Sequence, residues 1–177
     1  MKKYIRFGSL AAITAIAAAG FCFVAPAKAA EEKKMESKLS AGDKKFVKKA
    51  YKGGLKEVAE AKMAKEKAKN DATKDIAERM ITDHGKANDK LMEIAKEENL
   101  DLSAAEAKPA SFSDDNFDKD YLTELKKDHE KDIAMFEKEA GDTGAKEDSD
   151  VVKFAKDTLP TLKEHLQMVE DALAKVK

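Results

Sequence analysis

Residues 71–98 read DATKDIAERMITDHGKANDKLMEIAKEE and show the clearest helical pattern of the chain. Its apolar residues recur every three or four positions, for example from Ile76 to Met80 and on to Leu91. This spacing predicts an amphipathic helix with one face turned toward a core. His84 lies four positions after Met80, so its imidazole belongs to the apolar face of that helix.

The same spacing recurs in three other segments of the chain. It predicts helices over about residues 43–69, 116–140 and 148–176. Only one or two residues separate the first helix from the second, which favours an antiparallel hairpin with a break at Asn70-Asp71 and Asp71 as the N-cap. The alternative is one long bent helix. A glycine-containing turn at 141–144 ends the third helix.

Two features interrupt the helical patterns. Pro160 removes a backbone hydrogen bond from the last helix, so we expect either a kink there or a helix in two pieces. Gly53 and Gly54 stand inside the first helix, where glycine costs about 1 kcal/mol relative to alanine. They predict either the close approach of another helix or a bend.

The connection over residues 99–115 is long, contains Pro109 and shows no sustained period. A helix of about 26 residues is about 39 Å long, and a connection of this length can reach about 56 Å. A short, a long and a short connection are typical of an up-down-down-up bundle with one crossover. We therefore predict an all-α, ferritin-like four-helix bundle whose crossover joins helices two and three. An up-down-up-down bundle is the alternative.

The N-terminal segment is typical of a secretory signal peptide. MKKYIR carries three cations, a short apolar run follows, and Ala27-Lys28-Ala29 offers small residues at the two positions that a signal peptidase reads. We predict a cleaved signal over residues 1–29, a flexible tether over 30–40 and the bundle over 41–177. The product is then exported, periplasmic or otherwise extracytoplasmic, without stable membrane insertion. The alternative is an uncleaved anchor, since about twenty apolar residues can span a bilayer.

Charge and cysteine content narrow the function classes. The signal segment holds four of the 34 basic residues and no acid, so 30 basic residues remain against 35 acidic ones. A net acidic chain argues against nucleic-acid binding, which needs a basic face. Cys22 is the one cysteine and would leave with the signal, so no disulfide would stabilise the product. The remaining length is enough for one domain held together by packing.

The chain has three histidines, and each falls near the middle of a different predicted helix. His84, His129 and His165 all lie on the apolar side of their helices, and Glu57 occupies the same place on the remaining helix. The middle of a helix stays at mid-height whichever way the helix runs. These four residues therefore converge in either topology and form the predicted site.

Three imidazoles and one carboxylate suit a single transition-metal ion, namely zinc, copper, iron or manganese. A dinuclear iron site is disfavoured, because no histidine has a glutamate three residues before it. Asp132, three residues after His129, is a spare ligand. The alternative is a metal-free polar network, in which the buried carboxylate of Glu57 pairs with a histidinium.

An acidic residue precedes each histidine, namely Asp83, Asp128 and Glu164. Each is turned about 100° around its helix from the histidine, so it cannot share the histidine's direction. We predict solvated flanks for all three. The alternative is that they orient an imidazole on a neighbouring helix.

These segments resemble the bacterial family called domain of unknown function 4142, which is grouped with the ferritin-like helical bundles. The resemblance covers the chain from about Leu39 to its end. It implies an exported four-helix domain and brings no established activity, ligand or catalytic residue. The matching marks are Asp43-x-x-Phe46, Gly54-x-x-Glu57-Val58, Ala77-x-x-Met80-x-x-Asp83-His84, Tyr121 with Asp128-His129, and Leu159-Pro160-x-Leu162-x-x-His165-Leu166.

The sequence thus favours an exported, ferritin-like metal-binding protein that stores or buffers metal, or gives redox protection, in the cell envelope. The alternative is a non-catalytic structural or stress-related envelope protein whose core histidines bind no metal. An enzyme that uses the metal on oxygen or peroxide, with Tyr51 or Tyr121 as a redox neighbour, is the weakest reading, because no residue pattern indicates a substrate pocket.

Overall fold

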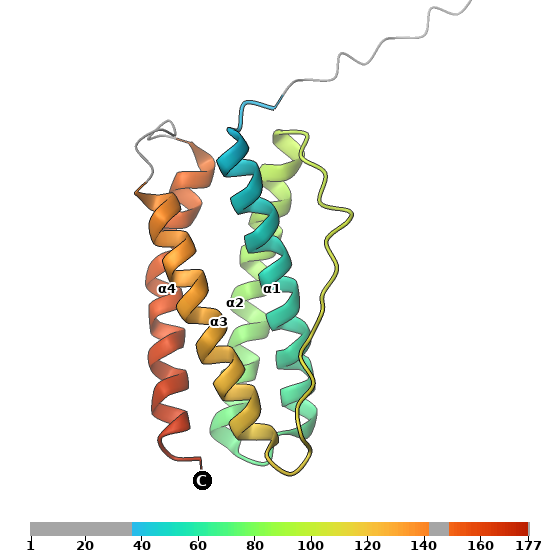
Figure 1. The fold of residues 1–177 in the computed structure, drawn as a ribbon, viewed down its shortest axis with the longest axis vertical. Helices are drawn as coiled ribbons and strands as arrows, with labels where there is room; N and C mark the ends of the chain where they lie inside the picture. The colour runs from blue at the N-terminus through green and yellow to red at the C-terminus, as the bar shows by residue number, and fades with distance from the viewer. Residues whose placement is uncertain (1–36, 142–148, 177) are drawn as a thin grey trace, which may run out of the picture. The chain divides into compact units, whose positions relative to one another are not determined.

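A computed structural model describes residues 37–141 and 149–176 (Figure 1). It confirms the all-α four-helix bundle and each predicted helix to within three residues at either end. The predicted signal peptide, most of the tether and residues 142–144 of the predicted turn lie outside the described residues. The helices are α1 (Ala41–Lys67), α2 (Asp71–Glu97), α3 (Phe117–Ala140) and α4 (Asp150–Leu173).

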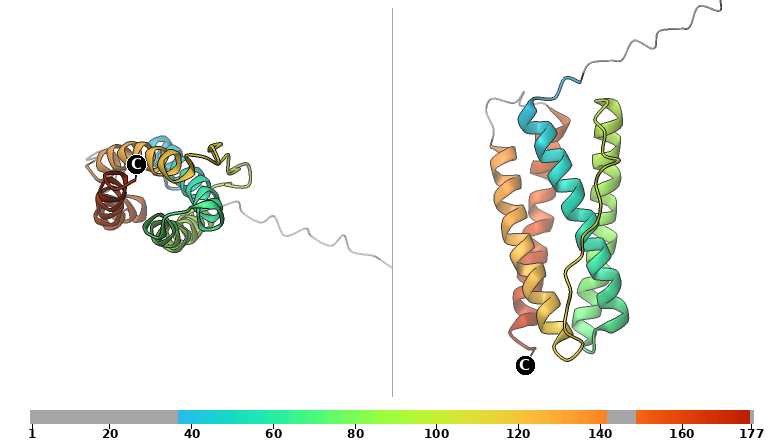
Figure 2. Two further views of the ribbon diagram at one scale, coloured as in Figure 1. Left: turned by 90° about the horizontal axis from the view of Figure 1, so that it is seen from below. Right: turned by 45° about the vertical axis from the view of Figure 1, so that its right-hand side comes forward.

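The connection between α2 and α3 runs from one end of the bundle to the other (Figures 1 and 2). At one end, the backbone N–H of Lys38, just before α1, donates to the Glu98 carboxylate after α2, at 2.6 Å. At the opposite end, the N–H groups of Lys69 and Asn70 donate to Asp118 in the first turn of α3, at 2.9 and 3.0 Å. Helices α2 and α3 therefore run parallel, which is the predicted up-down-down-up order. Helix α1 packs against α2 and α3, and α4 packs against α3 and α2.

Side-chain caps set the starts of three helices. Ser40 and Asp43 form a capping box at α1, in which each side chain bonds the backbone N–H of the other. At α2 the predicted cap was wrong by one residue. Asn70, and not Asp71, is the N-cap, and its side-chain oxygen accepts the N–H of Ala72 at 2.9 Å. Ser149 caps α4 in the same way through the N–H of Val152.

Helix α4 continues through Pro160 as one helix, so the predicted division into two pieces does not occur. Pro160 is exposed. The backbone carbonyl that loses its helical partner there can therefore be satisfied by water, which limits the cost of the proline.

No helix within the described residues is both long and apolar enough to cross a bilayer.

The core consists of two apolar clusters separated by a polar layer. The first cluster includes Met80, Tyr121 and Leu125, all fully buried, and the second includes Leu91 and Phe136. On every helix the predicted site residue lies between the part of the apolar stripe that enters one cluster and the part that enters the other. The four residues therefore share one level of the bundle, as their mid-helix positions predicted.

The crossover is attached to the bundle near that level. The buried carboxylate of Glu60 in α1 accepts the backbone N–H of Ala110 at 2.7 Å. Two residues further on, the ring of Phe112 packs edge-on against Phe117 and Tyr121, with centroids 5.4 and 5.9 Å apart. These contacts attach the crossover to α1 and α3.

Candidate metal centre

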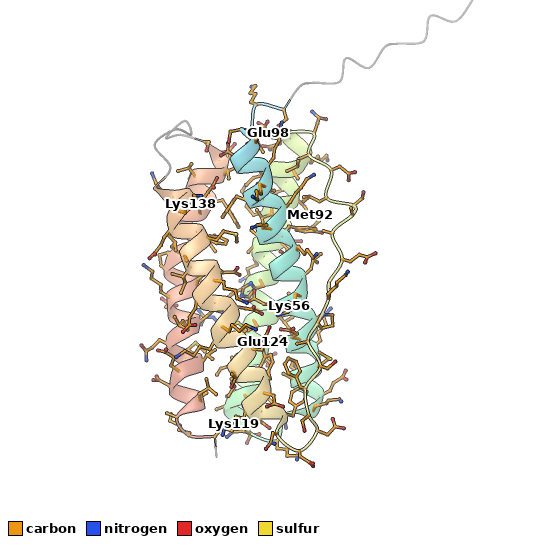
Figure 3. The ribbon with its side chains drawn as sticks, in the orientation of Figure 1. Lys56, Met92, Glu98, Lys119, Glu124 and Lys138 are labelled. Atoms are coloured by element: carbon orange, nitrogen blue, oxygen red, sulfur yellow. The ribbon has the colours of Figure 1, made fainter. Side chains whose placement is uncertain are left out.

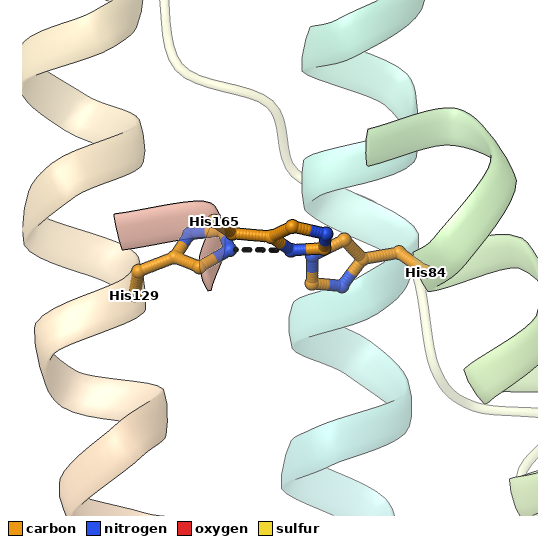
Figure 4. A group of neighbouring side chains, drawn as sticks. All are labelled: His84, His129 and His165. Carbon is orange, nitrogen blue, oxygen red and sulfur yellow. Dashed lines mark hydrogen bonds between the residues drawn. The ribbon is translucent and has the colours of Figure 1, made fainter. Parts of the chain in front are cut away.

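Glu57, His84, His129 and His165 meet in the polar layer, one from each helix. Each is exposed over at most 6% of its surface. One ring nitrogen from each histidine lies within 4.8 Å of the corresponding nitrogens of the other two. Figure 4 shows the three rings directed at one another from α2, α3 and α4. The predicted convergence of the three imidazoles is therefore present.

Burial makes the three rings neutral near pH 7. It lowers the pKa of His84 to about 3 and that of His129 to about 4, and nearby imidazoles add to both shifts. The pKa of His165 is also lowered by burial, although the Asp83 carboxylate opposes the shift. A neutral imidazole is the form that binds a metal ion.

The proton of the His129 ring is fixed by a backbone carbonyl near Nδ1. The carbonyl of Leu125 lies 3.0 Å from this nitrogen, and Oε1 of Glu57 lies 3.2 Å from it. The carbonyl can only accept, so the proton belongs on Nδ1. The Nε2 atom of His129 is then left with an unprotonated lone pair.

The proton of His165 is fixed in the same way on the opposite ring nitrogen. Nε2 of His165 donates to Oδ2 of Asp83 at 3.0 Å. Burial alone would raise the pKa of Asp83, but hydrogen bonds from Arg79 and His165 hold it below its usual range. Asp83 is therefore an anionic acceptor. Nδ1 of His165 is left unprotonated, and it lies 3.2 Å from Nε2 of His129.

His84 brings the third ring. Its Nδ1 lies 3.0 Å from Oε2 of Glu57. Its Nε2 is buried and has no hydrogen-bond partner among the described residues. Ring nitrogens bound to one tetrahedral zinc ion lie about 3.3 Å apart, because each Zn–N bond is about 2.0–2.1 Å. The distance between His129 and His165 already matches this spacing.

Glu57 lies on the Nδ1 side of His84 and His129, with one carboxylate oxygen beside each ring. Burial raises the pKa of Glu57 well above its ordinary value, and the charges of Asp132 and Asp128 raise it further. A carboxylate beside the outer nitrogen of an imidazole is the usual partner that orients a metal-binding histidine. The sequence placed Glu57 in the same layer but did not indicate which atoms it faces.

The three acids before the histidines have different surroundings. Asp83 bonds His165 on the neighbouring helix, so the predicted solvated flank was wrong there. The predicted solvated flank was also wrong for Asp128, because the carboxylate of Asp128 pairs with Lys56 of α1. Glu164 is exposed and lies 3.4 Å from Arg79, as a solvated flank would.

Lys56 joins α1 to α3 at the edge of the site. Its ammonium group lies 2.9 Å from Glu124 and also contacts Glu60 and Asp128. Figure 3 labels Lys56 and Glu124 on their neighbouring helices. Burial disfavours the charge, but hydrogen bonds to Asp128 and Glu124 outweigh that effect and raise the pKa of Lys56. Lys56 therefore stays cationic and balances the acids on this side.

Asn88 is a residue of the site that the sequence analysis missed. It lies one helical turn after His84, is 6% exposed, and has a buried carbonyl oxygen without a hydrogen-bond partner among the described residues. A Cβ atom at Gly54 would lie 2.4 Å from that oxygen. Gly54 therefore permits the close approach that the glycine pair predicted, and the i+4 spacing from His84 was the available signal.

A cavity of about 30 Å³ adjoins the histidines, which is room for one or two water molecules. Asp132, the predicted spare ligand, borders this cavity and is not one of the three clustered groups. Burial raises the pKa of Asp132 to about 7, and the charge of Asp128 contributes. All four helices contribute to the lining, which is Ala50, Gly54, Asp83, His84, Ala87, Asn88, Leu91, Asp132, Phe136, Phe154, Thr158, Thr161, Leu162 and His165.

The two tyrosines considered as redox neighbours lie in different places. Tyr121 is fully buried in the first cluster, and its hydroxyl has no hydrogen-bond partner among the described residues. Burial and the charges of Glu57 and Glu60 raise its pKa. Tyr51 is partly buried and packs against the second cluster. Tyr121 is therefore close enough to sense the charge of Glu57.

Comparison with known proteins agrees with the resemblance seen in the sequence. No curated protein and no solved structure matches the chain. A family model described as Domain of unknown function (DUF4142) matches residues 27–172, which include almost all of the four helices and every residue of the candidate site. The chain therefore belongs to the DUF4142 family.

Proposed function

We propose that this protein is an exported helical-bundle protein that binds one transition-metal ion through His84, His129 and His165. One observation carries the proposal. Hydrogen-bond acceptors fix the protons of His129 and His165 on the sides that face away from each other, Nε2 of His84 has no hydrogen-bond partner among the described residues, and one nitrogen of each ring lies within 4.8 Å of the others. Two lone pairs that face each other at 3.2 Å repel unless a proton or a metal ion lies between them.

Glu57 and Asp83 orient the ligands in this proposal. Glu57 lies beside Nδ1 of His84 and His129, and Asp83 accepts from Nε2 of His165. Outer partners of this kind fix the ring orientation and make the ligand more basic. The sequence predicted Glu57 as a fourth ligand, but its oxygens are not among the clustered ligand atoms, so in this proposal it acts on the ion through the imidazoles.

The ligand set favours zinc or copper over manganese. Three imidazoles without a thiolate suit zinc, copper or iron, whereas manganese prefers oxygen ligands. A site of this kind holds one ion per chain. That stoichiometry supports metal buffering, or protection from free redox-active metal in the envelope, over bulk storage.

A metal-free polar network is the second candidate. The distance of 3.2 Å between His129 and His165 also suits a hydrogen bond, which requires an additional proton on one ring. The lowered pKa of His129 disfavours that proton near neutral pH. In this reading the protein is a structural envelope protein with no bound ion.

Titration of metal-free protein with zinc, copper, iron and manganese near pH 7 distinguishes the metal site from the metal-free polar network. We expect one ion per chain with a Kd below about 10 μM, and a gain in unfolding free energy of about 2.7 kcal/mol at a hundredfold excess over Kd. Alanine at any one of the three histidines should abolish this binding. Gln167→Ala, an exposed change two residues from His165, is the control and should bind as the wild type does.

Two results would contradict the metal site. If no metal binds more tightly than about 10 μM, or if a variant lacking all three histidines binds as well as the wild type, the metal site does not exist. The polar network then accounts for the buried histidines.

A further inference from the structure

We propose that the cavity beside the histidines admits a small oxygen ligand with an O–H donor, water or hydrogen peroxide, to an open position on the bound ion. Asp132 and Asn88 are the groups that would accept its hydrogen bonds. The inference rests on the proposed metal site and extends it from metal binding to ligand binding.

The cavity touches the site directly. His84 and His165, two of the three proposed ligands, form part of its wall. Its volume of about 30 Å³ fits one or two water molecules, or one molecule with two or three heavy atoms. Its size therefore sets the upper limit on the ligand.

The two sides of the polar layer differ. On the side of the first cluster, Met80, Tyr121 and Leu125 are fully buried against one another. On the side of the second cluster, the small residues Gly54 and Ala87 border the cavity. Among the described residues, the room next to the histidines is on this second side.

Three imidazoles leave a tetrahedral ion with one further position. Sites with three protein ligands usually hold water or a substrate there, whereas purely structural zinc sites have four protein ligands. Asp132 does not belong to the cluster of converging ligand atoms. The fourth position is thus available to a ligand from the cavity.

The polar wall specifies the kind of ligand. The side-chain oxygen of Asn88 is buried without a hydrogen-bond partner among the described residues, and leaving it so costs about 1–3 kcal/mol. Asp132 adds carboxylate oxygens, which accept when ionised, and Thr158 and Thr161 add hydroxyl groups. A ligand that carries O–H donors satisfies these acceptors, while one without donors does not.

Cobalt(II) gives a visible spectrum that reports the ligands of the ion, so cobalt-loaded protein allows a direct test. Azide serves as a small probe without a donor at neutral pH. Hydroxylamine, with two heavy atoms and O–H and N–H donors, serves as a stable substitute for hydrogen peroxide. We expect both probes to change the spectrum of the wild type.

Two substitutions at Ala87 test whether the probes reach the ion through the cavity. Ala87→Leu places a larger side chain in the cavity wall and should weaken both probes at least tenfold while cobalt still binds. Ala87→Ser keeps the side chain small and should behave as the wild type does. Equal responses in the two variants would show that the probes reach the ion elsewhere, which overturns the role of the cavity.

Asp132→Ala tests the acceptor. It removes the carboxylate without filling the cavity and should weaken hydroxylamine about tenfold without weakening azide. Equal weakening of both probes would overturn the role of Asp132. Cobalt binding without any spectral response in the wild type overturns this inference alone. Failure of cobalt to bind would overturn the metal site and the inference together.

Discussion

Nε2 of His129 lies 3.2 Å from Nδ1 of His165, although the other nitrogen of each ring already faces an oxygen. The carbonyl of Leu125 and the carboxylate of Asp83 hold the ring protons away from this contact. With neutral rings the contact is between two lone pairs, so either a further proton or the proposed metal ion would have to lie between them.

Asp83 and Asp128 provide a matched pair of substitutions, because each directly precedes a histidine. Asp83→Asn weakens the acceptor that orients His165, so we expect metal affinity to fall about 10–100-fold with unchanged stoichiometry. Asp128→Asn removes the charge of a partner of Lys56 and should leave the metal affinity within about threefold of the wild-type value. Calorimetric titration measures both. Equal losses in the two variants would contradict the assignment of Asp83.

Gly53 and Gly54 should respond oppositely to alanine. A Cβ at Gly53 meets Asp132 at an ordinary 3.7 Å, so Gly53→Ala should stabilise the fold by up to about 1 kcal/mol through helix propensity. A Cβ at Gly54 would lie 2.4 Å from Asn88, so Gly54→Ala should destabilise by about 1–3 kcal/mol. Urea unfolding measures both. Stabilisation by Gly54→Ala would show that Asn88 does not pack against α1.

The pH dependence of stability has two opposing sources in metal-free protein. The lowered pKa values of His84 and His129 give stability that is present above about pH 6.5 and falls as the pH drops toward 4. Asp132, with a pKa of about 7, acts oppositely, because the folded state binds a proton that the unfolded state lacks between about pH 4 and 7.

Asp132→Asn removes the opposing contribution. Between pH 6 and 5, the unfolding free energy of this variant should fall more steeply than that of the wild type, by about 1.4 kcal/mol per pH unit. Urea unfolding at several pH values measures the difference. Equal slopes would show that Asp132 is ionised in the folded protein near neutral pH.

The sequence predicted the helices and the site level because both follow from spacing along one helix. Apolar periodicity located α1 to α4, and mid-helix positions placed Glu57 and the three histidines at one level. The crossover was predicted from connection lengths alone. These quantities are local in the chain, so no knowledge of packing was needed.

The features that the sequence missed depend on contacts between helices. Asp83 points away from His84 on its own helix and reaches His165 on another, which no spacing within α2 reveals. The cavity exists because small residues of different helices, Gly54 and Ala87 among them, come to the same place. Asn88 gained its importance in the same way, through its approach to α1.

The proposed three-histidine metal site is tested most directly by a crystal structure of zinc-loaded protein with anomalous diffraction recorded at the zinc edge. We expect one buried peak per chain, about 2.0–2.1 Å from Nε2 of His84, Nε2 of His129 and Nδ1 of His165. Glu57 should remain on the Nδ1 side of His84 and His129, without bonding the ion. A peak elsewhere, or no peak in the bundle at a zinc concentration that saturates binding in solution, would contradict the account.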